Sequence, residues 1–426
     1  MMFSMLDLKK ITESLRDCPC GRKHEINIRA LEIGFGNTPD TGRILRDAGF
    51  DGALHVVADQ NTLAAAAGIA DALRTARFRT TLTLFDDLQL ADIEGVERVR
   101  RDIARCGAKA VLSVGTGSLN DICRFAAAQL DMPFAIYATA PSMDGFASVM
   151  APITQNGFKR TFPAKAPEVI IADSAVLAKS PAVLKAAGLG DLLGKYTAHA
   201  DWEVAACLTG EYYCEKIASL TRAAVDDAAE LARRSDAESP EFSASLMEAL
   251  VLSGLAMLLS GCTRPASGAE HHIAHFWEMQ YALLGRPQVF HGKKVGIAAG
   301  LVADVYNRLA QLDTIHEMRR PIDWTRLSTV YGALWNECRA ENTPNPVDAI
   351  PAGAVEKNWE TLRAALARVP KGDEIRALIR RTGGAATCAE ADIPAYLEDQ
   401  GLRYGRYARF RMTMMRLLDI IEENPI

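Results

Sequence analysis

The chain has 426 residues, 49% of them hydrophobic and 24% charged. That length exceeds the ~100–200 residues of one domain, and the ordinary globular composition excludes the collagen-like, disordered and coiled-coil classes. Acidic residues outnumber lysine and arginine by 53 to 48, so the net charge is −5 and no basic excess is available to bind nucleic acid.

Cysteine usage and hydropathy indicate the compartment. The nine cysteines are scattered rather than gathered in a short framework, which favours reduced thiols. Residues 1–17 lack the continuous apolar core of a signal peptide, and the most apolar stretch, residues 249–261, is shorter than the ~20 residues that span a bilayer. We therefore expect a cytoplasmic protein without membrane insertion, in which residues 249–261 form a buried helix.

Strand and helix patterns divide the chain in two. Between residues 28 and 173, β-branched runs alternate with alanine-rich helical stretches, which is typical of βαβ units around a parallel sheet. Beyond Pro181 the β-branched runs vanish and apolar residues recur at spacings of three and four. We predict a Rossmann-like α/β domain over residues 1–176 and an all-helical domain over residues 177–426. The expected strands are 29–33, 53–58, 79–85, 109–114, 133–138 and 168–172.

The first glycine turn, Gly34-Phe35-Gly36, follows the strand at 29–33, and the next strand ends at Asp59. We interpret this segment as the first βαβ unit, in which an acid at the end of the second strand can accept hydrogen bonds from an adenosine ribose. The third glycine of the GxGxxG fingerprint is absent, so an ordinary strand-to-helix turn is the alternative.

A second turn, from Gly115 to Leu119, leads directly into a predicted helix whose free amides can bind an anion. A third segment, residues 139–145, also follows a strand and is rich in small polar residues. Loops at the carboxyl ends of parallel strands open on one crevice, where such sheets bind ligands. The alternative is that these are only the tight turns that any α/β protein needs.

Four of the eight histidines fall between residues 271 and 291. His271 and His275 are four apart and so share one face of a helix, with Glu278 one turn further along, whereas His272 points about 100° away. Two such imidazoles and one carboxylate, for which Asp191 is the best candidate, would hold a divalent ion and leave positions open for a substrate oxygen. The alternative for each histidine is a hydrogen-bonded core residue.

Six segments carry a resemblance, and in chain order they are SVGTGSLNDICRF, ATAPSMDGFAS, FPAKAPEVIIAD, GLGDLLGKYTAHADW, RPASGAEHHIAHFWE and HGKKVG. They resemble the sn-glycerol-1-phosphate dehydrogenase family, which is grouped with glycerol dehydrogenases, iron-type alcohol dehydrogenases and dehydroquinate synthases. The resemblance implies a dehydroquinate synthase-like fold, with a nucleotide-binding α/β domain, a metal- and substrate-binding helical domain and a cleft between them. It also implies interconversion of dihydroxyacetone phosphate and sn-glycerol 1-phosphate by hydride transfer at C2, with NAD or NADP and one divalent ion, zinc or nickel.

The same resemblance implies the site residues. The metal ligands would be Asp191, His271 and His291, and the groups that act on the substrate would be Asp144, Asp191 and His275. The cofactor would lie along Asp59, Gly115, Thr116, Gly117, Ser118, Leu119, Thr139, Ser142 and Ser148. Helical domains of this kind often supply dimer contacts, so we expect a homo-oligomer, a dimer or larger.

Several alternatives stay open. Asp59 favours NAD because an acid there repels a 2′-phosphate, and use of both cofactors is the alternative. Lys159, Arg160 and Lys165 are candidates for the substrate phosphate. Lys195 stands where iron-type alcohol dehydrogenases place a histidine, so a fourth protein ligand is missing and iron is disfavoured. The alternative functions are those of a glycerol dehydrogenase or another polyol or alcohol dehydrogenase, a dehydroquinate synthase-like cyclase, and a non-catalytic nucleotide-binding subunit.

Two segments outside these motifs also contain candidate functional residues. Cys18, Cys20 and His24 could belong to a zinc knuckle, but three ligands so close together rarely complete a tetrahedral site, so a plain loop is favoured. Five arginines alternate with aromatic residues over residues 403–416. A nucleic-acid surface is one interpretation, and the net negative charge favours the other, a solvated helix face that pairs with the acidic stretches nearby.

Overall fold

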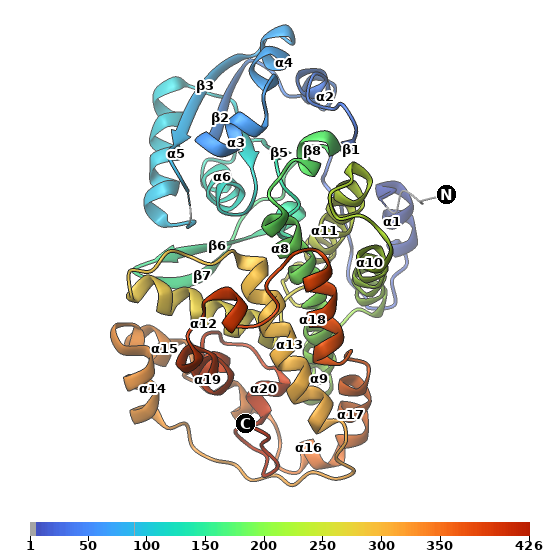
Figure 1. Ribbon diagram of the computed structural model, residues 1–426, viewed down its shortest axis with the longest axis vertical. Coiled ribbons are helices and arrows are strands. Elements are labelled where there is room, and N and C mark those ends of the chain that lie inside the picture. The colour runs from blue at the N-terminus through green and yellow to red at the C-terminus, as the bar shows by residue number, and fades with distance from the viewer. Residues whose placement is uncertain (1–5, 89) are drawn as a thin grey trace.

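A computed structural model describes residues 6–88 and 90–426, and shows a sheet-bearing half joined to a helical half (Figure 1). Residues 1–5, part of the segment in which no signal peptide was expected, lie outside the described residues. All six predicted strands are present and form one parallel sheet. Their bounds are β1 Ala30–Gly34, β2 Ala53–Asp59, β3 Arg79–Phe85, β4 Ala110–Gly115, β5 Phe134–Ala138 and β8 Val169–Asp173.

The sheet has the strand order β1-β8-β5-β4-β2-β3. Its central strands β2, β4, β5 and β8 are buried along their whole length, as expected for a parallel sheet covered on both faces. The chain passes from β2 to β3 in one direction and then places β4 on the other side of β2. Such a reversal leaves a crevice at the carboxyl ends of the two strands, which is where parallel sheets bind ligands.

The prediction that residues 29–59 form the first βαβ unit is wrong. β1 lies at the edge of the sheet, and β8, β5 and β4 separate it from β2. The turn after β1 holds an internal carboxylate, because Asp173 accepts hydrogen bonds from the amides of Gly36 and Thr38, each at 3.0 Å. These amides are therefore not free for a phosphate, and the alternative, an ordinary strand-to-helix turn, holds.

An antiparallel hairpin that the sequence analysis did not predict lies between the two halves (Figure 1). It consists of β6 Met150–Gln155 and β7 Phe158–Pro163. Asn156 and Gly157 form its turn with φ of +53° and +74°. An Asn-Gly pair is a strong hairpin signal and could have revealed it.

Helices cover both faces of the sheet. Side chains of α2 and α4 pack in a hydrophobic core on one face, and those of α5 and α6 belong to the larger core on the other. The bounds are α1 Leu8–Leu15, α2 Thr41–Asp47, α3 Gln60–Ala65, α4 Ile69–Thr75, α5 Ile93–Cys106, α6 Gly117–Gln129 and the 3-10 turn η1 Gly145–Ala147.

Residues 177–426, all of them described, contain no strand. The predicted boundary at 176/177 falls inside α7 and stays a prediction. The helices are α7 Ser174–Ala178, α8 Ala182–Leu193, α9 Lys195–Thr209, α10 Glu215–Arg234, α11 Pro240–Ser260, α12 Ala269–Leu283, α13 His291–Leu309, α14 Trp324–Tyr331, α15 Trp335–Glu341, α16 Ala354–Lys357, α17 Trp359–Ala367, α18 Gly372–Arg381, α19 Ala395–Tyr404 and α20 Met414–Leu417. The 3-10 turns are η2 Gly332–Leu334, η3 Pro346–Ala349, η4 Ala389–Ala391 and η5 Gly405–Tyr407.

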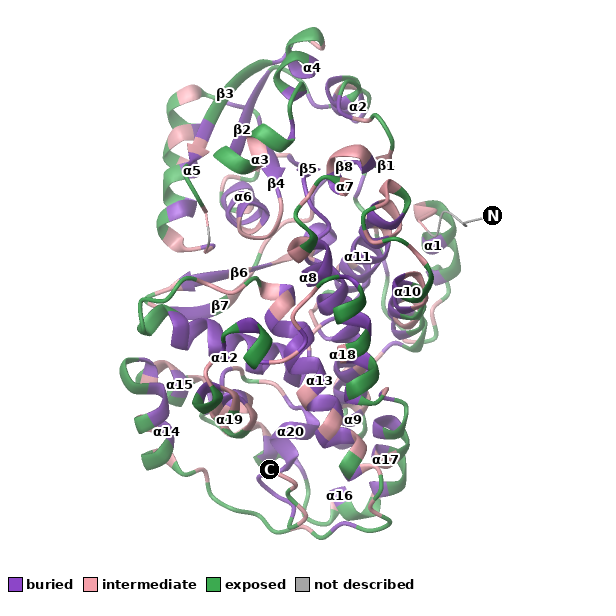
Figure 2. Cartoon of the chain, in the orientation of Figure 1, coloured by how far each residue is buried: buried purple, intermediate pink, exposed green. Residues whose placement is uncertain are grey.

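The apolar stretch at 249–261 forms most of α11, as expected. By length and composition this helix could cross a membrane, but 78% of its most apolar window is buried inside the protein. Figure 2 colours α11, together with α8, α12 and α13, mostly as buried. The hydropathy of α11 is therefore explained by its place in the core.

Helices α8 and α13 approach each other through glycines. A Cβ atom at Gly190 would lie 2.7 Å from the carbonyl oxygen of Gly292, and one at Gly292 would overlap the carbonyl of Ala187. Only glycine permits this approach of the two backbones. Because Asp191 follows Gly190 and His291 precedes Gly292, the contact also sets the distance between these two side chains.

We predict that Gly292→Ala lowers the free energy of unfolding by about 1–3 kcal/mol, because the added methyl group forces α13 away from α8. Denaturant unfolding would measure the change. The matched control is Gly300→Ala on the same helix, where the three atoms nearest to the new Cβ, the first at 3.3 Å, all belong to the flexible side chain of Arg376. An equal loss in both variants would contradict the role assigned to the Gly292 contact.

Candidate functional site

Three side chains of the helical half converge as the sequence analysis proposed. Asp191 lies near the end of α8, His271 in the first turn of α12 and His291 at the first residue of α13. One ligand atom from each lies within 4.8 Å of the other two, and His271 Nε2 is 3.5 Å from Asp191 Oδ1. Such ligands bind zinc-like ions at about 2.0–2.2 Å, so one ion fits among all three.

The protonation states of two of these groups suit a cation. Burial lowers the pKa of His291 to about 3, which leaves its imidazole neutral. Burial opposes ionisation of Asp191, but Lys195 and the two histidines outweigh it and hold the pKa of Asp191 far below its usual range. Metal ligands must be deprotonated, so both groups are ready to coordinate an ion.

Glu270 orients the third ligand. Its Oε1 lies 2.7 Å from His271 Nδ1 and also accepts a hydrogen bond from the amide of Gly268, while Oε2 accepts one from Thr197. A carboxylate on one ring nitrogen keeps that nitrogen protonated and leaves Nε2 to face Asp191. Glu270 had no predicted role, although it stands next to His271 in the quoted motif.

Lys195 had no predicted role in the site, but the structure places it between two of the site's carboxylates. It is fully buried, and its Nζ lies 2.8 Å from Asp144 Oδ2 and 2.9 Å from Asp191 Oδ1. Burial disfavours its charge, but these two carboxylates outweigh burial and raise the pKa of Lys195. An ammonium group cannot ligate a cation, so Lys195 neutralises carboxylate charge instead of replacing the missing histidine.

Asp144 joins this cluster from the loop after β5. Its amide donates to Asp191 Oδ2 at 3.0 Å, and its own Oδ2 accepts from Ser253 at 2.8 Å. Burial and the neighbouring charge of Asp191 raise the pKa of Asp144, against the effect of Lys195. The substrate residue predicted in the α/β half thus lies directly beside the predicted metal ligand of the helical half.

A second group of charges lies next to the histidines. His275, His291 and Glu278 offer ligand atoms within 4.8 Å of one another. Glu278 pairs with Lys159 Nζ of the hairpin at 2.8 Å and with Lys294 Nζ of α13 at 3.5 Å. Burial lowers the pKa of His275, so its imidazole is neutral near pH 7. Two buried lysines therefore share one carboxylate at this place.

The structure separates the three candidates for binding phosphate. Lys159 lies in this second group, whereas Arg160 is exposed and its guanidinium lies over the Phe158 ring. Lys165 pairs with Glu168 at 3.5 Å. Lys294 was present in the quoted motif but had no predicted role.

The solvated helix face predicted for residues 403–416 is present only at its start, where Arg403 is exposed and pairs with Asp399 at 2.8 Å. The rest of the prediction is wrong. Arg416 is fully buried, and Arg406 pairs with Asp419 at 3.2 Å. Arg409 has a buried Nη2 atom with no hydrogen-bond partner among the described residues. Burial lowers the pKa of Arg409, and the carboxylate of Glu278 is among the charges that act on it.

His272 and His199 belong to neither group of donors found among the described residues of the site. The Nε2 atom of His199 is 3.1 Å from the carbonyl oxygen of Pro265. Both nitrogens of His272 are buried without a hydrogen-bond partner among the described residues. The structure therefore offers these two side chains no shared metal position with Asp191.

The predicted cofactor loops lie at the switch point of the sheet. Val57 of β2 pairs with Ser113 of β4, so Asp59 and Gly115, each two residues further on, end neighbouring strands. The hydroxyls of Thr116 and Ser142 are 2.7 Å apart and link the loops after β4 and β5.

Helix α6 begins at Gly117, and its N-cap residue Thr116 makes no side-chain cap. First-turn amides of a helix lack partners within the helix and can bind a phosphate. The Leu119 side chain packs in the core beneath Gly115, so only its backbone could face a cofactor.

The remaining predicted cofactor residues are buried near these loops. The Thr139 amide donates to the carbonyl of Gly115, and Ser148 accepts from the amide of Met150 at 3.0 Å. The Asp59 carboxylate accepts from the amide of Thr62 and so caps α3. The oxygen Oδ1 of Asp59 is used by this cap.

Several known proteins are similar to this chain. Residues 32–181 match the family model of the iron-containing alcohol dehydrogenases. The chain is 31% identical over 418 residues to the glycerol-1-phosphate dehydrogenase (NAD(P)+) of Geobacillus stearothermophilus, covering 97% of this chain and 98% of the relative. It is 32% identical over 425 residues to the protein of the same name from Halalkalibacterium halodurans, with the same two coverages.

The fold also has counterparts among solved structures. An archaeal alcohol dehydrogenase from a Red Sea brine pool superimposes with a TM-score of 0.61 at 16% identity, over 95% of each chain. At that identity the likeness concerns the fold alone. It confirms the predicted class, a parallel-sheet domain followed by a helical domain.

We predict that Glu270→Gln weakens metal binding about ten- to a hundredfold, because His271 loses the carboxylate that orients it. Titration of the metal-free protein with zinc, followed by calorimetry, would measure the affinity. The control is Glu97→Gln on α5, an exposed residue paired with Arg100, which should bind metal as the parent does. Unchanged affinity in Glu270→Gln would show that Glu270 does not position the ligand.

Proposed function

The chain belongs to the glycerol-1-phosphate dehydrogenase family, and on this basis we propose that it interconverts dihydroxyacetone phosphate and sn-glycerol 1-phosphate by hydride transfer at C2. The reaction would use NAD(P)H and one divalent metal ion. The observation that carries the proposal is the adjacency of two groups: the Asp191, His271 and His291 donors, and the buried lysines around Glu278.

Asp191, His271 and His291 would hold the ion. When bound, it supplies a Lewis acid that stabilises negative charge on the C2 oxygen. Two nitrogens and one oxygen are a donor set that suits both zinc and nickel, and we infer that one of these is used. Glu270 would keep His271 aligned, and Lys195 would keep the carboxylate pair Asp144–Asp191 from repelling each other.

The substrate phosphate would bind where positive charge exceeds negative. Lys159 and Lys294 share Glu278, and Arg409 adds a buried guanidinium atom with no protein partner among the described residues. A phosphate dianion would complete this group. Dihydroxyacetone has nothing to place there, which favours a phosphorylated triose over glycerol as substrate.

Two side chains would handle the rest of the substrate. Asp144 is held by Lys195 and Ser253 and could accept a hydrogen bond from a terminal hydroxyl. His275, neutral and one helical turn from His271, could carry a proton to or from the C2 oxygen. The hydride itself would pass between C2 and the nicotinamide.

The cofactor would enter at the carboxyl ends of β2, β4 and β5. Its pyrophosphate would lie on the amides that open α6, with the loop residues Thr116 and Ser142 beside it. Asp59 would accept from the adenosine ribose, which favours NAD and leaves NADP as the second cofactor. A homo-oligomeric state and a cytoplasmic location stay predictions from the sequence.

The decisive experiment offers the purified protein dihydroxyacetone phosphate with NADH and with NADPH, and determines the chirality of the product. We expect cofactor oxidation and the sn-1 enantiomer. Asp191→Ala or prolonged chelation should reduce the rate at least about a hundredfold, because Lewis-acid stabilisation is worth several kcal/mol. Equal turnover of dihydroxyacetone would instead indicate a glycerol dehydrogenase, and phosphate release without net NADH change a cyclase.

A second prediction concerns the phosphate. Lys159→Met should raise the KM for dihydroxyacetone phosphate about ten- to a hundredfold, since a hydrogen bond to a charged group is worth about 1.5–3 kcal/mol. Activity toward unphosphorylated dihydroxyacetone, however slow, should not fall in parallel. Steady-state kinetics of the matched variant Lys165→Met, whose lysine pairs with Glu168, should resemble those of the parent. Equal KM values for dihydroxyacetone phosphate in both variants would show that Lys159 does not bind the phosphate.

A further inference from the structure

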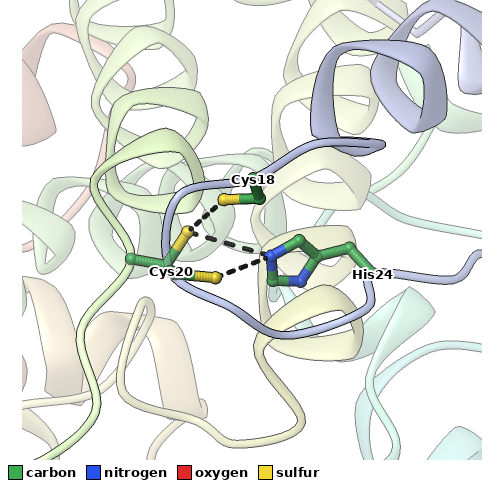
Figure 3. Close-up of side chains that lie close together, drawn as sticks. Cys18, Cys20 and His24 are labelled. Carbon is green, nitrogen blue, oxygen red and sulfur yellow. Dashed lines mark hydrogen bonds between the residues drawn. The ribbon is translucent and has the colours of Figure 1, made fainter.

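Four side chains of types that can bind a metal ion meet outside the site described above. Cys18, Cys20, His24 and Cys214 each offer one atom, and these atoms all lie within 4.8 Å of one another. Cys18 Sγ is 3.4 Å from Cys214 Sγ, and His24 Nε2 is 3.1 Å from Cys20 Sγ and 4.0 Å from Cys214 Sγ. Figure 3 shows Cys18, Cys20 and His24 turned toward one another on the N-terminal segment.

The sequence favoured a plain loop because three close ligands rarely complete a tetrahedral site. Cys214 supplies the fourth ligand and removes that reason. Three of the donors lie between α1 and β1, and Cys214 is the N-cap residue of α10, 190 residues after His24. The short run alone could not close a tetrahedral site, but the fold supplies the missing ligand. Three thiols and one imidazole are a common donor set of structural zinc sites.

The separations match those of ligands around one ion. With Zn–S bonds of about 2.3 Å and a Zn–N bond of about 2.0–2.1 Å, tetrahedral ligand atoms are roughly 3.5–3.8 Å apart. Three of the six separations are 3.1, 3.4 and 4.0 Å, on either side of that value, and all six are within 4.8 Å. A disulfide requires sulfurs about 2.05 Å apart, much closer than Cys18 and Cys214 are here, and would leave Cys20 and His24 without a role.

The surroundings hold the donors in place. His24 Nδ1 lies 2.8 Å from the carbonyl oxygen of Leu259, at the end of α11, which fixes the tautomer that leaves the Nε2 lone pair facing the sulfurs. The Tyr212 hydroxyl is 3.5 Å from Cys20 Sγ, and the backbone carbonyl of Tyr212 accepts from Trp202 Nε1 at 2.6 Å. His24 and Cys214 are buried, so the cluster is screened from solvent on that side.

We propose that Cys18, Cys20, His24 and Cys214 bind one zinc ion in a closed, structural site. All four positions are taken by protein, so no substrate can reach the ion, in contrast to the open site at Asp191. The ion would fasten the N-terminal segment to the helical half, where Lys216 Nζ also donates to the carbonyl of Ser14. This site is independent of the proposed dehydrogenase activity.

Metal analysis of the full-length protein, purified without added chelator, tests the proposal. To remove the open site, the comparison is made in a His271→Ala, His291→Ala background. That background should retain one zinc per chain, and adding Cys20→Ser or Cys214→Ser should remove it. Cys207→Ser, which changes an exposed cysteine of α9 outside the cluster, is the matched control and should keep the zinc.

A spectroscopic measurement covers the case in which the serine variants do not fold. Cobalt added to the metal-stripped His271→Ala, His291→Ala protein should give the intense thiolate-to-cobalt absorption of a sulfur-rich tetrahedral site, and zinc should abolish it. X-ray absorption of the zinc form should show Zn–S distances of about 2.3 Å. A background protein that binds neither metal, a spectrum of nitrogen and oxygen ligands only, or a Cys18–Cys214 disulfide in the purified chain would each overturn the proposal.

Discussion

The carboxylate of Asp191 is completely buried, and side chains and a backbone amide from several elements neutralise or hydrogen-bond it. Leaving such a charge unpaired would cost several kcal/mol, and removing one partner of a buried pair typically costs about 3–5 kcal/mol. Lys195 comes from α9, His271 from α12 and the amide of Asp144 from the loop after β5. Since these groups belong to both halves of the chain, neutralising one carboxylate also fixes the sheet half against the helical half.

Two neighbouring groups of charge differ in sign. Around Asp191, two carboxylates share one lysine, and around Glu278 one carboxylate shares two lysines. The first group favours a cation and the second an anion, and His291 offers a ligand atom to both sets of donors. A substrate that carries an oxygen to be polarised and a phosphate to be held matches this pair, which is why the charges support the proposed triose phosphate.

The Asp191 group and the Cys18 group of candidate metal ligands differ in how many donors they offer. The Asp191 group has three protein donors, one fewer than a tetrahedral ion takes, as is typical of catalytic metal sites. The Cys18 group has four donors and no vacancy in a tetrahedron. Both depend on contacts between segments distant in the chain, such as the glycine contact of α8 with α13 and the approach of the N-terminal segment to Cys214.

Local patterns in the sequence determined the six strands, the helical second half, the buried helix at 249–261 and the spacing that puts His271 and His275 on one helix face. These properties follow from the periods of strand and helix, which every short segment carries by itself. The motifs also named Asp191, His271 and His291, which the structure brings together. Lys159 was one of three equal candidates until the hairpin placed it beside Glu278.

Tertiary structure alone decided which distant residues meet. The edge position of β1, the bond of Lys195 to two carboxylates, the burial of Arg416 and the arrival of Cys214 beside Cys18 and Cys20 have no local signature. Each depends on how whole elements pack, and packing is a sum over many weak contacts between remote parts of the chain. For the same reason the sequence around Cys18 offers only three metal-binding side chains, and folding brings Cys214 beside them as the fourth.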